Sequence, residues 1–149
     1  MDYIKAQQDI LSAILSKDQP RRVLYRKTVG QLTHLFHPCG LYGYVIPDDQ
    51  MAINLDLCTL LERNPCKFCL VEDAHEITAT GVMLEHNKRM LLEFKSQDGA
   101  LSYFDKRLLA KFGKGARLYQ EAPLLAATIT DAEQLLIGYL CPVNFKKNN

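Results

Sequence analysis

The sequence has almost no net charge and no long apolar run. Its 18 lysines and arginines stand against 17 aspartates and glutamates, which leaves a formal charge of +1. No whole-molecule field therefore draws the chain to DNA or to a membrane, and any such attraction has to be local. The longest stretch without these four residue types, residues 28–47, is interrupted by three glycines and two histidines. A bilayer helix needs about 20 predominantly apolar residues, so we expect no membrane partner.

The sequence also lacks the features of a secreted chain. Its first residues carry Asp2 and Asp9 around a short apolar patch and have no basic region, so we expect no signal peptide. Its five cysteines are an odd number in a chain long enough to fold without disulfides. We therefore expect a cytoplasmic protein.

Motifs of the common nucleotide and cofactor sites are missing as well. The run Gly113-Lys114-Gly115 is too short for a phosphate-binding loop, and no GxGxxG occurs. No pair of acids for hydrolysis can be chosen from the sequence. We therefore expect no cofactor, no catalytic residues and no enzymatic activity.

The patterns that are present indicate one α+β domain over residues 1–149. With 48% hydrophobic residues, a chain of this length can bury about 68–70% of its unfolded surface. An amphipathic helix is predicted behind Asp2 and ends near Lys17, and a short basic helix is predicted near 106–112, between Asp105 as N-cap and Gly113. Alternating patterns predict a mainly antiparallel sheet. The expected strands are Val23–Lys27, Gln31–His37, Leu41–Ile46, Met51–Leu57, Ile77–Leu84, Arg89–Lys95, Leu101–Phe104, Ala116–Gln120, Leu124–Ile129 and Leu135–Val143, with a helical turn over Cys58–Arg63.

Cys66 and Cys69 form a CxxC motif, with Cys58 before it and His75 after it. Zinc takes four nitrogen or sulfur ligands in a tetrahedron, and such a motif supplies two of them. The chain has no second paired motif, and the CxxC lacks the glycine that usually relieves its turn. Ordinary cysteines are the favoured interpretation, so we expect no metal site; zinc binding and redox chemistry stay as alternatives.

His34, His37 and Cys39 lie close together in the sequence and suggest a metal site or a Cys–His nucleophile. In a strand, the two histidines would point to opposite faces because their separation is odd. A catalytic pair also needs a third group that orients the base, and none stands nearby in the sequence. Polar residues on a sheet face and in the following turn are the favoured interpretation.

The distribution of charged residues along the sequence indicates a candidate binding segment. Between residues 99 and 117, Asp105 is the only acid among five cations. The apolar stripe of the predicted helix places its cations on the exposed side, although cations in a first turn oppose the helix dipole. A solvated face is the favoured interpretation of this segment, and the alternative, which we carry forward as the candidate site, is contact with the DNA backbone. The candidate contacts are Lys106, Arg107, Lys111, Lys114 and Arg117, with a smaller cluster at Arg21, Arg22, Arg26 and Lys27.

Four short motifs follow one another between residues 103 and 145. They are Phe104-Asp105 with Leu108-Leu109, then Arg117-Leu118-Tyr119, then Pro123-Leu124-Leu125, and finally Leu140-Cys141-Pro142-Val143-Asn144. Their order resembles the closing half of a bacterial DNA polymerase sliding-clamp domain. In that family a strand leads into a leucine-rich helix, and then into a strand, a Pro-apolar-apolar strand and a last strand ending Met-Pro-Met-Arg.

The resemblance implies a clamp-like fold whose basic helix faces DNA. It also implies that Cys141, Pro142 and Val143 line a groove for partner peptides. The chain departs from the family in three respects. Cys141-Pro142-Val143 stands where the family has Met-Pro-Met, Asn144 stands where it has arginine, and the chain has room for one domain where a clamp chain holds three. A ring would therefore require a homo-oligomer.

The sequence thus predicts a non-enzymatic, clamp-like interaction domain that acts through protein contacts and through the DNA backbone. The alternative is a small protein-binding or inhibitory module, for example one encoded by a phage, with no role on nucleic acid. A Cys/His-based enzyme or a zinc module is the third hypothesis. A likeness in fold does not by itself establish function.

Overall fold

The computed structural model of the chain describes residues 1–16, 23–53, 59–62 and 74–145. Helices and strands both occur in it, and the predicted α+β class is confirmed. The chain divides into two compact units, Met1–Cys66 and Lys67–Asn149, and the expectation of a single domain stays a prediction. In the ranges given above, none of the helices has the length and apolar character that a bilayer crossing demands.

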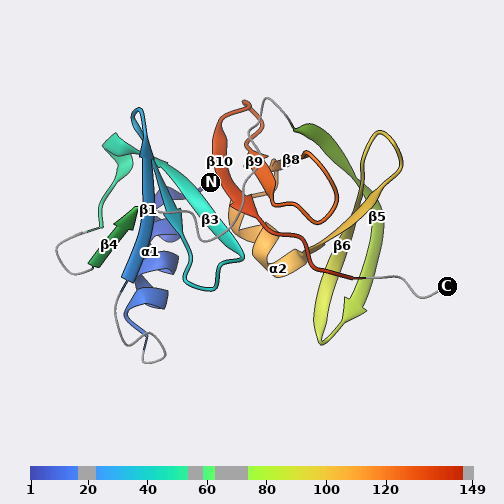
Figure 1. The fold of residues 1–149 in the computed structure, drawn as a ribbon, viewed down its shortest axis with the longest axis horizontal. Coiled ribbons are helices and arrows are strands. Elements are labelled where there is room, and N and C mark those ends of the chain that lie inside the picture. The colour runs from blue at the N-terminus through green and yellow to red at the C-terminus, as the bar shows by residue number, and fades with distance from the viewer. Residues whose placement is uncertain (17–22, 54–58, 63–73, 146–149) are drawn as a thin grey trace. The chain divides into compact units, whose positions relative to one another are not determined.

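In its described residues, the first unit has one α-helix and four strands (Figure 1). Its elements are α1 (Tyr3–Ile14), β1 (Val23–Val29), β2 (Leu32–Phe36), β3 (Tyr42–Pro47), the 3₁₀ turn η1 (Asp48–Gln50) and β4 (Thr59–Glu62). The strands follow the order β4-β1-β2-β3, in which only the β1–β4 pair is parallel. The predicted cap of α1 is confirmed, since the Asp2 carboxylate accepts hydrogen bonds from the backbone N–H groups of Ile4 and Lys5 at 3.0 and 3.1 Å.

The buried side chain of Gln7 fastens α1 to the segment before β4. Its Nε2 atom donates to the carbonyl of Gln50 at 2.9 Å. Its Oε1 atom accepts from the backbone N–H groups of Ala52 and Ile53 at 2.6 and 3.2 Å. One amide side chain therefore binds backbone groups that a neighbouring strand would otherwise bind.

Two expectations for the first unit are wrong. The predicted strand Met51–Leu57 does not form over residues 51–53, where Gln7 takes the backbone N–H groups; residues 54–57 lie outside the described ranges. The predicted helical turn Cys58–Arg63 is instead the strand β4 over its described residues, because these residues pair with β1 from Val23↔Thr59 to Arg26↔Glu62. In both places a distant part of the chain supplies the deciding partner.

Over residues 74–145 the second unit contains six strands, in the order β10-β9-β8-β5-β6-β7, and all neighbours are antiparallel. The bounds are β5 (His75–His86), β6 (Arg89–Lys95), β7 (Leu101–Asp105), β8 (Arg117–Gln120), β9 (Ala127–Thr130) and β10 (Leu136–Leu140), with α2 (Lys106–Leu109) and the 3₁₀ turn η4 (Ala110–Phe112) between β7 and β8. Beyond β10 the chain returns to β7, where the N–H of Val143 donates to the carbonyl of Tyr103 at 2.7 Å. The two ends of the strand series therefore meet.

The loop between β8 and β9 corrects a third expectation. The predicted strand Leu124–Ile129 begins only at Ala127. Before it, the buried Gln120 donates from Nε2 to the carbonyl of Leu125 at 2.8 Å, and Leu124 has a φ of +71°. The motif Pro123-Leu124-Leu125 is therefore an exposed turn rather than part of a strand.

Replacing Gln7 with methionine is expected to lower the free energy of unfolding by about 1–3 kcal/mol, because methionine fills a similar volume and leaves the backbone groups of residues 50–53 without that partner. Urea denaturation followed by circular dichroism measures the change. Gln8→Met is the matched control, since Gln8 is exposed on the same helix, and it should change stability by less than about 0.5 kcal/mol. Equal losses in the two variants would contradict the role given to Gln7.

Candidate functional site

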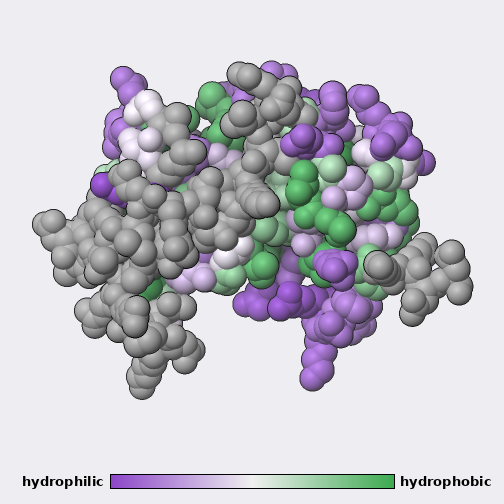
Figure 2. Space-filling view, in the orientation of Figure 1, coloured by the Kyte–Doolittle hydropathy of each residue, from purple (hydrophilic) through white to green (hydrophobic). Residues whose placement is uncertain are grey.

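Exposed cations of the second unit gather between β7 and β8. Lys106 and Arg107 lie in α2, Lys111 lies in η4, and Lys114 lies in the loop before β8. All four residues are exposed, and together they are termed the basic segment. Figure 2 shows hydrophilic residues, in purple, along the lower edge of the second unit, over α2 and over the tip of the β5–β6 hairpin.

The conformation of the basic segment follows from two buried residues that enclose it. Asp105 is only 9% exposed, and its Oδ1 atom accepts from the N–H groups of Arg107 and Leu108 at 2.8 and 3.4 Å. Phe112 is buried at the other end, and Gly113 turns the chain with a φ of +91°. The predicted N-cap is confirmed. The one acid among these cations therefore faces the backbone while the cations face solvent.

Arg117, the fifth predicted cation, has a partner of its own. It lies in β8, and its guanidinium forms a two-point ion pair with Glu76 of β5, with Nε–Oε1 at 2.9 Å and Nη2–Oε2 at 3.2 Å. The hydrogen bonds to Glu76 raise the pKa of Arg117. Its charge is thus largely compensated within the unit, and its contact with DNA stays a prediction.

The smaller cluster of cations belongs to the first unit. Arg26 and Lys27 lie in β1, and Arg26 is half-buried. Arg21 and Arg22 lie outside the described residues.

The predicted groove residues Cys141, Pro142 and Val143 follow β10 and are half-buried. Residues 141–145 are termed the C-terminal strap. It is held to β7 by the Val143–Tyr103 bond, and the ring of Phe145 packs edge-on against the rings of Tyr103 and His86, with centroids 5.0 and 4.9 Å apart. A role of these residues in binding a partner peptide stays a prediction.

A buried acid near the strap had not been singled out from the sequence. Glu93 of β6 is 6% exposed, and its two carboxylate oxygens accept from Thr80 Oγ1 and from the Tyr103 hydroxyl, both at 2.9 Å. Burial and the bond to Glu93 raise the pKa of Tyr103. The sequence feature that points to Glu93 is that it is the single acid within the apolar run Met90-Leu91-Leu92-Glu93-Phe94. A charged side chain on a strand that is buried on both faces needs hydrogen-bond partners.

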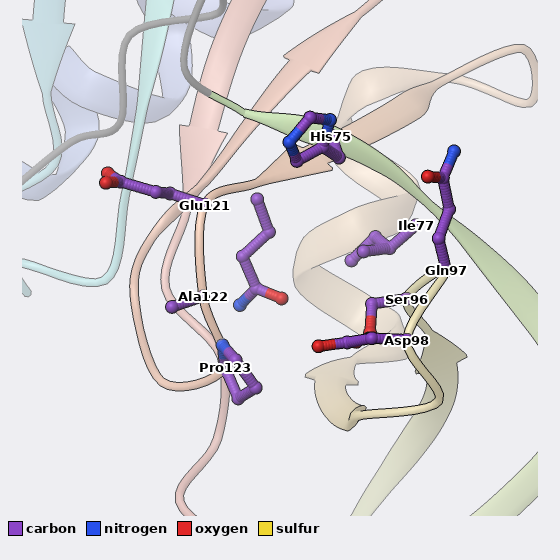
Figure 3. A pocket seen from close by; sticks show the side chains of 9 residues that line it. His75, Ile77, Ser96, Gln97, Asp98, Glu121, Ala122 and Pro123 are labelled. Carbon is purple, nitrogen blue, oxygen red and sulfur yellow. The ribbon is translucent and has the colours of Figure 1, made fainter.

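A pocket of about 210 Å³ lies between the β6–β7 turn and the β8–β9 loop (Figure 3). Its wall includes His75, Ser96 and Asp98, which are the residue types of a hydrolase triad. In a triad the serine gives its proton to the histidine. Here the Ser96 hydroxyl donates to Asp98, and no hydrogen bond joins it to His75 in the described part of the chain. Asp98 also accepts from the N–H of Ala100, so the pair closes a turn, and these bonds lower the pKa of Asp98.

The first unit brings an acid close to His37 and Cys39, the pair considered above as an alternative nucleophile. Asp9 accepts from the hydroxyls of Tyr42 and Tyr44 at 2.7 and 2.6 Å, and the His37 ring stacks on Tyr42 at 4.6 Å. Burial and the bonds to Asp9 raise the pKa of both phenols. The side chain of Asp9 therefore ties α1 to β3, beside the histidine.

The geometry of Cys39 differs from that of an activated thiol. The Nδ1 atom of His37 accepts from the backbone N–H of Cys39 at 3.1 Å, so this bond does not reach the sulfur. Partial burial of the thiol raises its pKa, and the negative charge of Asp9 adds to the shift. A nucleophilic cysteine requires a lowered pKa. His34 is buried in β2.

Metal ligands do not gather in the described ranges, where no three His, Cys, Asp or Glu side chains form a group that could hold an ion. Cys58, Cys66 and Cys69 lie outside these ranges, and His75 begins β5. The zinc alternative therefore stays a hypothesis.

Replacing Asp105 with alanine is expected to lower the free energy of unfolding by about 1–2 kcal/mol, because the N-cap of α2 is lost. Asp105→Asn should retain most of the stability, since asparagine accepts the same backbone hydrogen bonds. Urea denaturation compares the two variants. An equal loss in both would mean that the negative charge, and not the cap, stabilises this helix.

Alkylation of Cys39 by iodoacetamide is expected to be slower at neutral pH in the folded chain than in the same chain unfolded in urea. The raised pKa leaves less thiolate, so the midpoint of the rate against pH should move upward on folding. Mass spectrometry of the peptide that contains Cys39 separates its reaction from those of the other cysteines. A midpoint lower in the folded chain would favour the Cys–His nucleophile.

Comparison of the chain with protein-family models, with curated proteins and with solved structures finds no match.

Proposed function

We propose that the chain is a non-enzymatic interaction domain whose basic segment binds the phosphate backbone of DNA. The observation that supports the proposal is that Lys106, Arg107, Lys111 and Lys114 are all exposed while Asp105 is buried as a cap. These cations create a local positive field on a chain whose formal charge is only +1.

The dimensions of α2 argue for contacts with phosphates rather than with bases. Helix α2 contains four residues, about one turn, and so cannot lie along a major groove as a recognition helix does. Phosphate contacts position a protein on the duplex without reading its sequence. The proposed binding is therefore independent of base sequence.

The expected affinity is modest and depends on salt. Each neutralised phosphate releases counterions and contributes about −0.9 to the slope of log affinity against log salt, so the four cations give at most about −3.6. Binding without sequence preference typically has a Kd of about 10⁻⁴–10⁻⁶ M at physiological salt. The odd number of cysteines favours the cytoplasm as the place of action.

Action as a sliding clamp is the narrower form of the proposal. The order β7, α2, β8, β9, β10 supports the resemblance, whereas the turn at Pro123-Leu124-Leu125 counts against it. A chain of this size would need to form a closed oligomer in order to encircle a duplex. Light scattering that gives a monomer at micromolar concentration would remove the ring and leave backbone binding untouched.

The alternative function, a protein-binding module, is favoured by the loop between β8 and β9. Leu124 is 65% exposed there and has a φ of +71°, which is costly for a residue with a side chain. The buried Gln120 holds this loop by its bond to Leu125. A loop that is already held in one conformation presents this leucine to a protein partner at a lower ordering cost on binding.

The double variant Lys106→Glu/Lys111→Glu is expected to weaken DNA binding at least about tenfold, since charge reversal removes two phosphate contacts and repels the backbone. Fluorescence anisotropy at low salt measures binding to two unrelated duplexes, for which the wild-type affinities should agree. The matched control is Lys5→Glu/Lys95→Glu, which makes the same charge change at exposed lysines elsewhere.

Both double variants should unfold close to the wild-type temperature, because all four lysines are exposed. Equal loss of binding in the control would mean that the net charge of the chain, and not the position of Lys106 and Lys111, determines the affinity for DNA. If the wild type does not bind DNA at low salt, the proposal is wrong and the protein-binding module is the better interpretation of the function.

A further inference from the structure

The tip of the β5–β6 hairpin gathers hydrogen-bond donors that the proposed function does not use. The strands are joined by Asn87 and Lys88, whose φ angles of 50° and 63° form a tight two-residue turn. His86 and Arg89 are the last directly opposed pair, so their side chains share one face of the hairpin. Asn87 Nδ2 lies 3.2 Å from His86 Nε2, which places the amide beside the imidazole.

The C-terminal strap supplies the other wall. Figure 1 shows it, in dark red, running past β6 toward β5, and the ring of Phe145 packs on His86. Between the hairpin and the strap lies a pocket of about 260 Å³, lined by His86, Asn87, Arg89, Val143 and Asn144. Segments more than fifty residues apart in the sequence therefore build one pocket.

The polar groups that line this pocket are mainly hydrogen-bond donors. Arg89, Asn87 and Asn144 bring N–H donors, His86 brings an imidazole, and Val143 adds one apolar surface. No carboxylate lines the pocket. Within the described ranges, none lies in ion-pair distance of the exposed Arg89. The pocket therefore favours an anion that accepts several hydrogen bonds.

From this geometry we infer that the pocket binds a phosphate group, free or carried as a small monoester. A guanidinium pairs with phosphate through two parallel hydrogen bonds, and phosphate offers three strong acceptor oxygens to the amides, more than a carboxylate does. Pockets for drug-sized ligands run from about 300 Å³ upward, so a phosphate with a small substituent suits the size. This inference concerns a second place in the unit and does not rest on DNA binding by the basic segment.

The test is a ¹⁵N–¹H correlation titration of the full chain with inorganic phosphate and, separately, with glycerol 3-phosphate as a small monoester, with sodium chloride at matched ionic strength as the blank. Saturable shifts are expected at the amides of Asn87, Arg89 and Asn144. Arg89→Gln should raise the Kd at least about tenfold, because a charged hydrogen-bond partner is lost. Lys95→Gln is the matched control, since it removes one exposed positive charge at the other end of the same strand, and it should bind as the wild type does.

Each outcome decides the inference. Binding of both ligands, or of either alone, supports the pocket and identifies whether free phosphate or a monoester is its ligand. No saturable shift at these amides, or a Kd unchanged by Arg89→Gln, overturns it. Lys106→Glu/Lys111→Glu should still bind phosphate at these amides, and Arg89→Gln should keep the salt-dependent DNA binding, so failure of one proposal is distinguishable from failure of the other.

Discussion

The capping of α2 by Asp105 is the interaction on which the basic segment depends. A single helical turn gains little from its own hydrogen bonds, because forming the first turn costs more than it returns. Two bonds from backbone N–H groups to the Asp105 carboxylate, and the burial of Phe112, hold this turn in place. The same contact keeps the one acid of the segment away from its cations. The cap formed by Asp105 therefore accounts both for the helical turn of α2 and for the net positive charge that this segment exposes.

Other acids of the second unit are occupied in a similar way. Glu76 pairs with Arg117 across β5 and β8, and Glu93 accepts hydrogen bonds from the hydroxyls of Thr80 and Tyr103. A buried carboxylate with such partners is stabilised without a cation. Both carboxylates thus have partners outside the basic segment.

Several expectations failed where a side chain or strand outside the local pattern supplied a better partner than that pattern implied. The alternating run that begins at Met51 was a sound strand signal, yet Gln7 takes the N–H groups of residues 52 and 53. The residues of β4 became a strand because β1 offered them an edge. Leu124 left its predicted strand because Gln120 holds the loop in a turn. Gln7 and β1 lie outside any local sequence window, whereas Gln120 lies only five residues before Leu125 and holds the loop because the fold buries its side chain.

The sequence by itself determined what depends on neighbours along the chain. These are the caps at Asp2 and Asp105, the β5–β6 hairpin, the α+β class and the exposed cations of α2, because capping and periodicity act within a few residues. Only the tertiary structure decided that Arg117 pairs with Glu76, 41 positions away, and that Asn144 lies in one pocket with His86. Ion pairs and pockets join residues through space, and the pairing of strands that are distant in the sequence, which no local pattern encodes, sets which residues meet.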